Sequence, residues 1–148
     1  MLLDSVAILD AVRVTFEEMA FLDVAAGPST GETRPQEGAV LCLTYVAPRT
    51  GTFSLKLPKE LKFAVAEAIY GDDWHDLTAG QLDDSLLELM NVLAGRLLSR
   101  RFGSATYTMG LPMIQYNQPL SHPQWNLEQF SFHVDEIGFM LTWTEEAE

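Results

Sequence analysis

The chain has 148 residues, of which 47% are hydrophobic and 10% aromatic, and its formal net charge is −12 at pH 7. These values indicate one folded domain, residues 1–148, with a core that needs no disulfide or structural metal. The acidic balance disfavours binding to nucleic acid or to an anionic membrane surface. Cys42 is the single cysteine, and the N-terminus lacks the basic residues of a signal peptide. We therefore expect a cytoplasmic protein.

The first third of the chain predicts a helix, a loop and a β-hairpin. Apolar residues recur at helical spacing over 4–21, where the first helical turn can be capped by Asp4 or Ser5. Residues 25–38 are rich in Gly, Pro, Ser and Thr, which is typical of a loop. The runs AVLCLTYVA and GTFSLKLP are β-type, and PRTG between them supplies the turn of a hairpin.

Two helices follow in the middle of the chain. Pro58 suits the first turn of a helix that continues through LKFAVAEAIY, and Gly71 is a plausible C-terminal cap. The acidic loop GDDWHDLTAG then leads to a long helix over 81–102. Asp72, Asp73, His75 and Asp76 in this loop could bind a divalent cation, but they lack the ordered spacing of an EF-hand. A solvated acidic loop is the preferred interpretation.

The last third of the chain predicts strands. ATYTMGLPMIQY is expected to be extended, with Pro112 at a strand end or bulge. LEQFSFHV and GFMLTWT alternate apolar and polar residues around DEIG, which predicts a second hairpin. Blocks of helices and strands joined by short turns indicate an α+β fold, a largely antiparallel β-sheet with about three helices on one face. An edge strand within FSFHV or FMLTW could extend the sheet to a second copy, which would give a homodimer.

Four residues of the long helix are the candidate functional residues: Asp84, Glu88, Asn91 and Gly95. Their steps of four, three and four place them in a stripe about 60° wide. The opposite side of the helix carries Leu86, Met90, Leu93 and Leu97. Asn and Gly cost a helix interior roughly 0.5 and 1 kcal/mol relative to Ala, which suggests a surface shaped for something other than helix stability. On spacing alone, a merely solvated face remains open.

The helix and its flanks, DDSLLELMNVLAG followed by GLP, resemble the CheC/CheX/FliY family of chemotaxis phosphatases. The signature of that family is an Asp or Ser, three residues, Glu, two residues, Asn, and a Pro further on. The matching positions are Asp84, Glu88, Asn91 and Pro112, and Gly95 fits the form common in CheX-like members. FEEMAFLDV, FAVAEAIYG and MGLPMI resemble the family's first helix, second helix and proline-bearing strand.

Two departures from the family pattern refine this resemblance. The interval from Asn91 to Pro112 is slightly shorter than usual in the family. Some relatives carry a second Glu-x-x-Asn site on the first helix, but here Glu17 and Glu18 are followed by Ala20 and Phe21. The chain therefore resembles a single-site, CheX-like member.

The resemblance implies a phosphatase that removes the phosphoryl group from an aspartate of a CheY-type response-regulator receiver domain. Asn91 would orient the attacking water, and Glu88 would pair with the receiver's lysine. Asp84, Gly95 and Pro112 would contact the partner. The chain would need no cofactor or metal of its own, since the receiver supplies Mg²⁺. The alternative is a non-catalytic receiver-binding or flagellar-switch-like module, and a third option is a degenerate member with an unrelated ligand.

Overall fold

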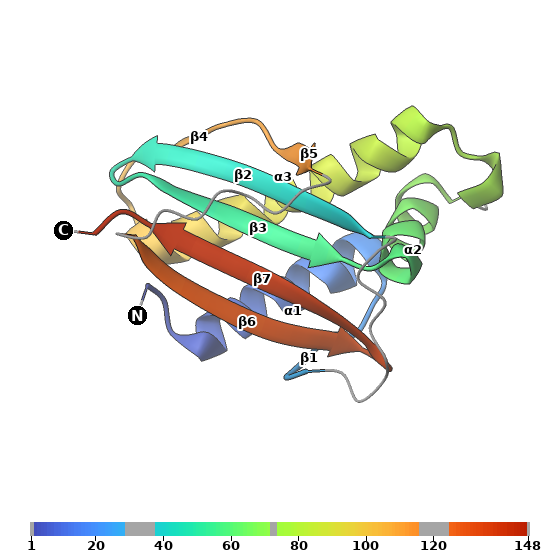
Figure 1. Ribbon diagram of the computed structural model, residues 1–148, viewed down its shortest axis with the longest axis horizontal. Coiled ribbons are helices and arrows are strands. Elements are labelled where there is room, and N and C mark those ends of the chain that lie inside the picture. Colours follow the sequence, from blue (N-terminus) through green and yellow to red (C-terminus); the bar gives the residue numbers. More distant parts are fainter. Residues whose placement is uncertain (1, 29–37, 72–73, 116–124, 148) are drawn as a thin grey trace.

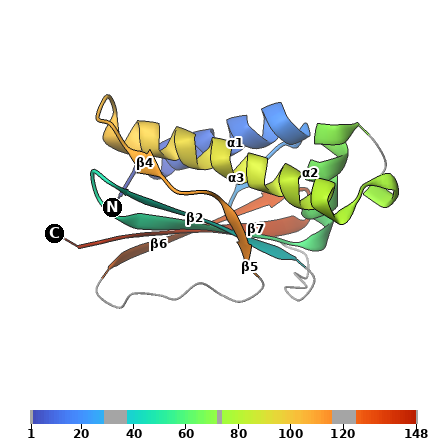
Figure 2. The same cartoon turned by 90° about the horizontal axis from the view of Figure 1, so that it is seen from above.

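In the computed structural model, which describes residues 2–28, 38–71, 74–115 and 125–147, three α-helices lie on one face of an antiparallel sheet. Figure 1 looks onto this sheet, and Figure 2 shows the two layers from the side. The helices are α1 (Ser5–Ala20), α2 (Lys59–Tyr70) and α3 (Ala79–Phe102), with a short 3-10 turn at Trp74–Asp76. The predicted α+β class and the single helical layer are confirmed.

The described strands follow the spatial order β1-β6-β7-β3-β2-β4, and β5 also pairs with β2. Their bounds are β1 Ala25–Ala26, β2 Ala39–Ala47, β3 Gly51–Leu57, β4 Thr108–Met109, β5 Met113–Gln115, β6 Asn126–Val134 and β7 Ile137–Glu145. Both predicted hairpins are present, as β2–β3 and β6–β7. All pairings among these strands are antiparallel. Two of them are the hairpins, and the other four, β1–β6, β3–β7, β2–β4 and β2–β5, join segments far apart in the sequence.

Three details differ from the sequence-based expectations. Ala25 and Ala26, expected in a loop, form a short strand that pairs with His133 and Phe132 of β6. The segment FMLTW lies in β7 between β6 and β3, so it is not an edge strand. Pro58 is the N-cap of α2 and precedes its first turn. The short strand was missed because two alanines carry no β signal of their own and are fixed by a partner more than a hundred residues away.

The core lies between the helices and the sheet. Alternate residues of the strands face the helices, as the period of two requires, and Leu41, Phe53, Leu55, Leu141 and Trp143 are fully buried there. Phe16 of α1 stacks on Phe139 of β7, with ring centroids 4.8 Å apart. The helix α1 thus lies over β7, whereas α3 lies over β2 and β5. This arrangement leaves one side of α3 facing solvent beside the β4–β5 edge of the sheet.

Candidate functional site

The candidate site lies on α3, whose start is fixed by a capping box. The Thr78 hydroxyl accepts a hydrogen bond of 3.1 Å from the Gln81 backbone, and the Gln81 side chain accepts one of 2.9 Å from the Thr78 backbone. These two bonds satisfy backbone donors that the first helical turn would otherwise leave unpaired. The helix therefore begins at Ala79, two residues before the predicted start.

One side of α3 is buried and the other presents the predicted stripe. Leu86, Met90, Leu93 and Leu97 are fully buried against the sheet and the other helices. Asp84, Glu88 and Asn91 are exposed. One helical turn separates each of these side chains from the next, so a carboxylate and a carboxamide project together into solvent. The predicted division of the helix into an apolar and a polar side is confirmed.

Gly95 continues the stripe toward the end of α3. A Cβ added there would meet no other atom within 4 Å, and the residue has an ordinary helical φ. The fold itself therefore gives no reason for glycine at this position, although alanine would stabilise the helix by about 1 kcal/mol. The absence of a side chain keeps the surface low between Asn91 and Ser99.

The segment from Tyr107 to β5 runs beside this exposed side of α3, as Figure 2 shows. The Tyr107 hydroxyl lies 3.4 Å from the Gly95 carbonyl and 3.0 Å from the Ser99 hydroxyl. At the other end of the segment, β5 pairs with β2 and contacts α3. Pro112 lies between these two attachments and is half-buried. The structure thus brings the proline-bearing segment to the same helix as Glu88 and Asn91.

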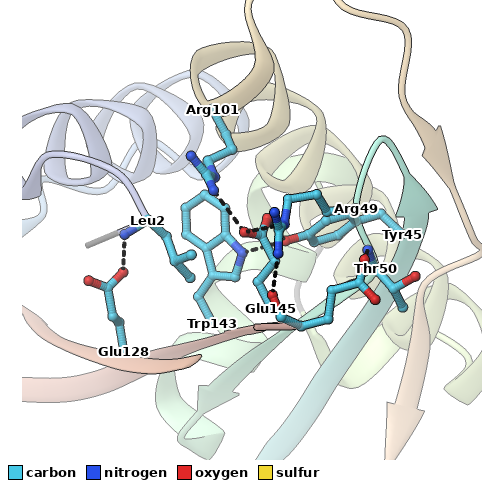
Figure 3. Close-up of polar contacts among 9 residues, drawn as sticks. Leu2, Tyr45, Arg49, Thr50, Arg101, Glu128, Trp143 and Glu145 are labelled. Carbon is cyan, nitrogen blue, oxygen red and sulfur yellow. Dashed lines mark hydrogen bonds and ion pairs between the residues drawn. The ribbon is translucent and has the colours of Figure 1, made fainter. Parts of the chain in front are cut away.

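A buried polar cluster holds the C-terminal end of α3 on the sheet (Figure 3). Arg101 donates a 2.8 Å hydrogen bond to Glu145, and the Tyr45 hydroxyl donates one of 2.9 Å to the same carboxylate. Trp143 donates through Nε1 to the Tyr45 hydroxyl at 2.8 Å. Burial raises the pKa of Tyr45, and the hydrogen bond to Glu145 raises the pKa of Arg101. The tyrosine therefore stays neutral and the arginine charged at physiological pH.

The other arginines near the end of α3 bind α1 rather than forming a free basic patch. Arg96 pairs with Glu18 and donates to the Thr15 hydroxyl at 3.0 Å. Arg100 pairs with Asp10. Glu18 is one of the two acids at the place where some relatives carry a second site, and its carboxylate is engaged by Arg96.

Two other features of the sequence are the acidic loop and the single cysteine. Asp72 and Asp73 of the acidic loop lie outside the described residues, and no group of three His, Cys, Asp or Glu side chains that could hold a metal occurs among those described. Cys42 is 6% exposed, and burial raises the pKa of its thiol. Cys42 is thus a buried thiol, which at neutral pH is not ionised.

Sequence reasoning did not single out two residues of the segment beside α3, Tyr107 and Leu111. Tyr107 binds α3 through its hydroxyl, and Leu111 is 86% exposed. The available signal for Leu111 was its place between Gly110 and Pro112, two residues that restrict a strand. Nothing in the sequence links Tyr107 to Gly95, since that contact depends on the tertiary fold.

Comparison with family models and with curated proteins finds no match for this chain. Comparison with solved structures finds similar proteins. The chemotaxis protein CheX from Desulfovibrio desulfuricans superimposes with a TM-score of 0.76 at 15% identity, over 96% of this chain and 98% of that one. CheX from Vibrio vulnificus superimposes with a TM-score of 0.74 at 14% identity, over 96% of this chain and 95% of that one. A chain of a CheX–CheY–BeF3–Mg complex from Borrelia burgdorferi superimposes with a TM-score of 0.70 at 14% identity, over 98% of this chain and 99% of that one.

These similarities cover nearly the whole chain and identify its fold as that of CheX- and CheC-like chemotaxis proteins. At such identities the shared property is the fold, and the chemistry has to be argued from the site. Within the described residues, no helix is long and apolar enough to cross a membrane.

Proposed function

We propose that this protein is a phosphatase for the phospho-aspartate of a CheY-type receiver domain. The observation that carries the proposal is the exposed pair Glu88 and Asn91, one turn apart on α3 of a CheX-like fold. The relative crystallised with CheY, BeF3 and Mg supports a receiver as the partner, because BeF3 on an aspartate mimics a phosphoryl group.

Asn91 is the proposed catalytic residue. Phosphoryl hydrolysis depends mainly on positioning and charge compensation. The Asn91 carbonyl would accept a hydrogen bond from a water molecule and hold it in line with the phosphorus, while the amide NH₂ would donate to a phosphoryl oxygen. The water oxygen forms a bond to phosphorus, the bond from phosphorus to the aspartate oxygen breaks, and inorganic phosphate and the free carboxylate are released. Mg²⁺ bound by the receiver would compensate the phosphoryl charge.

Glu88 is the proposed docking residue. An ion pair with the receiver's lysine would fix how the partner sits on α3 and so place Asn91 over the phosphoryl group. Asp84 lies one turn beyond Glu88 and would contact the partner at the rim of the interface. On the other side of Asn91, Gly95 and Pro112 would allow the partner to approach closely. This chain's own residues thus supply one half of the active site, and the receiver supplies the other.

The test is the lifetime of the phosphorylated receiver. Each receiver domain of the same genome would be phosphorylated with a small phosphodonor in Mg²⁺ and mixed with the protein. We expect at least one to lose phosphate faster, and Asn91→Ala to remove this acceleration while leaving binding to the BeF3-activated receiver within about threefold. Glu88→Ala should raise KM. Full activity of Asn91→Ala would refute the mechanism.

A matched control is available beside the stripe. Asp83 is a neighbour of Asp84 in sequence but lies about 100° around the helix, outside the stripe. Asp83→Ala removes the same charge as Asp84→Ala. A loss of receiver affinity or activity that occurs only in Asp84→Ala is therefore due to the position of Asp84 and not to the change in net charge. A receiver that binds tightly without losing phosphate any faster would identify a binding module instead.

A further inference from the structure

Leu111 has the highest exposed fraction of the large hydrophobic side chains in the described part of the chain, at 86%. Scattered exposed apolar residues are common and need no explanation. Leu111 differs from such residues in its position, because it belongs to the segment between β4 and β5, which runs beside the exposed side of α3 (Figure 2).

The backbone around Leu111 is held on both sides. The Gly110 N–H donates a 2.7 Å hydrogen bond to the Thr44 carbonyl, and a Cβ on Gly110 would come within 2.9 Å of that same oxygen. No side chain fits there without moving β2. On the other side, Pro112 has a fixed φ, and Met113 begins the pairing of β5 with Cys42 of β2. Leu111 is therefore presented to solvent from a constrained segment between β4 and β5.

A third attachment fixes this segment relative to the candidate site. The Tyr107 hydroxyl binds the Gly95 carbonyl and the Ser99 hydroxyl on α3. This segment and the stripe are thus connected through two residues of α3, Gly95 and Ser99, and one tyrosine. A hydrophobic side chain held in place before binding loses little conformational entropy when a partner covers it, which favours affinity.

We propose that Leu111 is a hydrophobic anchor for the receiver domain and inserts into an apolar depression beside the partner's phosphorylation site. This inference rests on the proposed function and assigns it a contact outside α3. A receiver is favoured as occupant because the segment that carries Leu111 is attached to α3, the helix that bears the acidic stripe. Asp84 and Glu88 of this stripe complement a partner site that carries lysine and Mg²⁺. A central apolar contact with charged groups around it is the usual organisation of a protein interface.

Two variants test the anchor against a matched control. Leu111→Ser removes the apolar side chain, and Leu111→Met keeps it. The control is Val6→Ser, which changes a residue that is 72% exposed on α1, the helix that lies over β7. Thermal melting of all three variants would confirm folding, since neither position contributes to the core.

The measurements are affinity for each BeF3-activated receiver in Mg²⁺ and steady-state dephosphorylation. We expect Leu111→Ser to weaken affinity and raise KM about tenfold with kcat unchanged, and Leu111→Met and Val6→Ser to stay near the original protein. Unchanged affinity in Leu111→Ser would refute the anchor while leaving the phosphatase proposal standing. The anchor would also be refuted if sedimentation showed that the protein is a dimer and that Leu111→Ser dissociates it without any loss of receiver affinity.

Failure of the proposed function gives a different pattern. If the protein bound an activated receiver without accelerating phosphate loss, the phosphatase proposal would fail, and the affinity of Leu111→Ser would still decide the anchor. If none of the activated receivers bound, both proposals would be refuted together.

Discussion

Arg101, in the last turn of α3, donates a 2.8 Å hydrogen bond to Glu145 at the end of β7, although the two residues are 44 positions apart. The Glu145 side chain is 1% exposed, and Arg101 is 27% exposed. A buried carboxylate needs such partners, because an uncompensated charge in the interior is strongly unfavourable. This pair therefore fixes the helix that carries the candidate site onto the sheet.

Arg101→Met should lower the free energy of unfolding by about 2 to 4 kcal/mol. The methionine keeps much of the apolar stem, but Glu145 loses its closest cation among the described residues and is left with Arg49 at 3.5 Å and the Tyr45 hydroxyl. Urea unfolding followed by circular dichroism measures the change. Arg100→Met is the control, since its ion pair with Asp10 is 33% and 56% exposed and should contribute less than about 1 kcal/mol. Equal losses of unfolding free energy in the two variants would contradict the conclusion that the Arg101–Glu145 pair fixes α3 onto the sheet.

Gly95→Ala should make the protein more stable and less active. Apart from the backbone of its own helix, the added methyl meets no atom of the described residues within 4 Å, so we expect the free energy of unfolding to rise by about 1 kcal/mol. The same methyl stands where the receiver is proposed to approach, and dephosphorylation should slow several-fold.

Gly80→Ala is the control for this prediction. It lies in the first turn of the same helix, and its added Cβ would meet only the Thr78 hydroxyl, at 3.9 Å. We expect it to raise or preserve stability without changing activity. Calorimetric melting and phosphate-release assays compare the two. An active Gly95→Ala would mean that the partner does not approach α3 at this residue.

Much of the fold follows from local sequence patterns. The two hairpins are recognisable because period-two alternation is interrupted by short turns, and α3 because its apolar residues recur every three or four positions. The pairing of β3 with β7, which places the two hairpins side by side, has no local signal. The same holds for Ala25 and Ala26, whose strand exists only because β6 offers an edge.

The candidate site is predictable to the same extent. Helical spacing alone puts Asp84, Glu88 and Asn91 on one side, and the burial of Leu93 and Leu97 on the other side agrees. The roles of these residues remain proposals. What the sequence could not provide is the neighbouring surface, because the position of Leu111 depends on the contacts of Tyr107 with α3 and of Gly110 with β2.

Asp84→Asn should lower the rate of association with the receiver in a salt-dependent way. Asp84 is exposed at the rim of the proposed contact, where a charge acts mainly on encounter and is screened by ions. We expect kcat/KM to fall several-fold at low ionic strength and the difference to disappear at about 0.5 M salt. Stopped-flow mixing with the activated receiver measures the association rate. A loss that persists at high salt would assign Asp84 a direct bonding role.

Cys42 should react with a chromogenic disulfide reagent only slowly in the folded protein. The thiol is 6% exposed, and burial raises its pKa above the ordinary value of 9.0, with the hydrogen bond to Ser54 opposing this effect. Because the pKa of the thiol is higher in the folded state, the contribution of Cys42 to the free energy of unfolding is fully present below pH 9 and is lost as the pH rises further. We expect one thiol per chain to react rapidly in concentrated urea, and the native rate to stay well below the unfolded rate from pH 7 to 9. Cys42→Ser, which leaves no cysteine, gives the baseline. A native rate equal to the unfolded one would show that the sheet face carrying Cys42 is open to solvent.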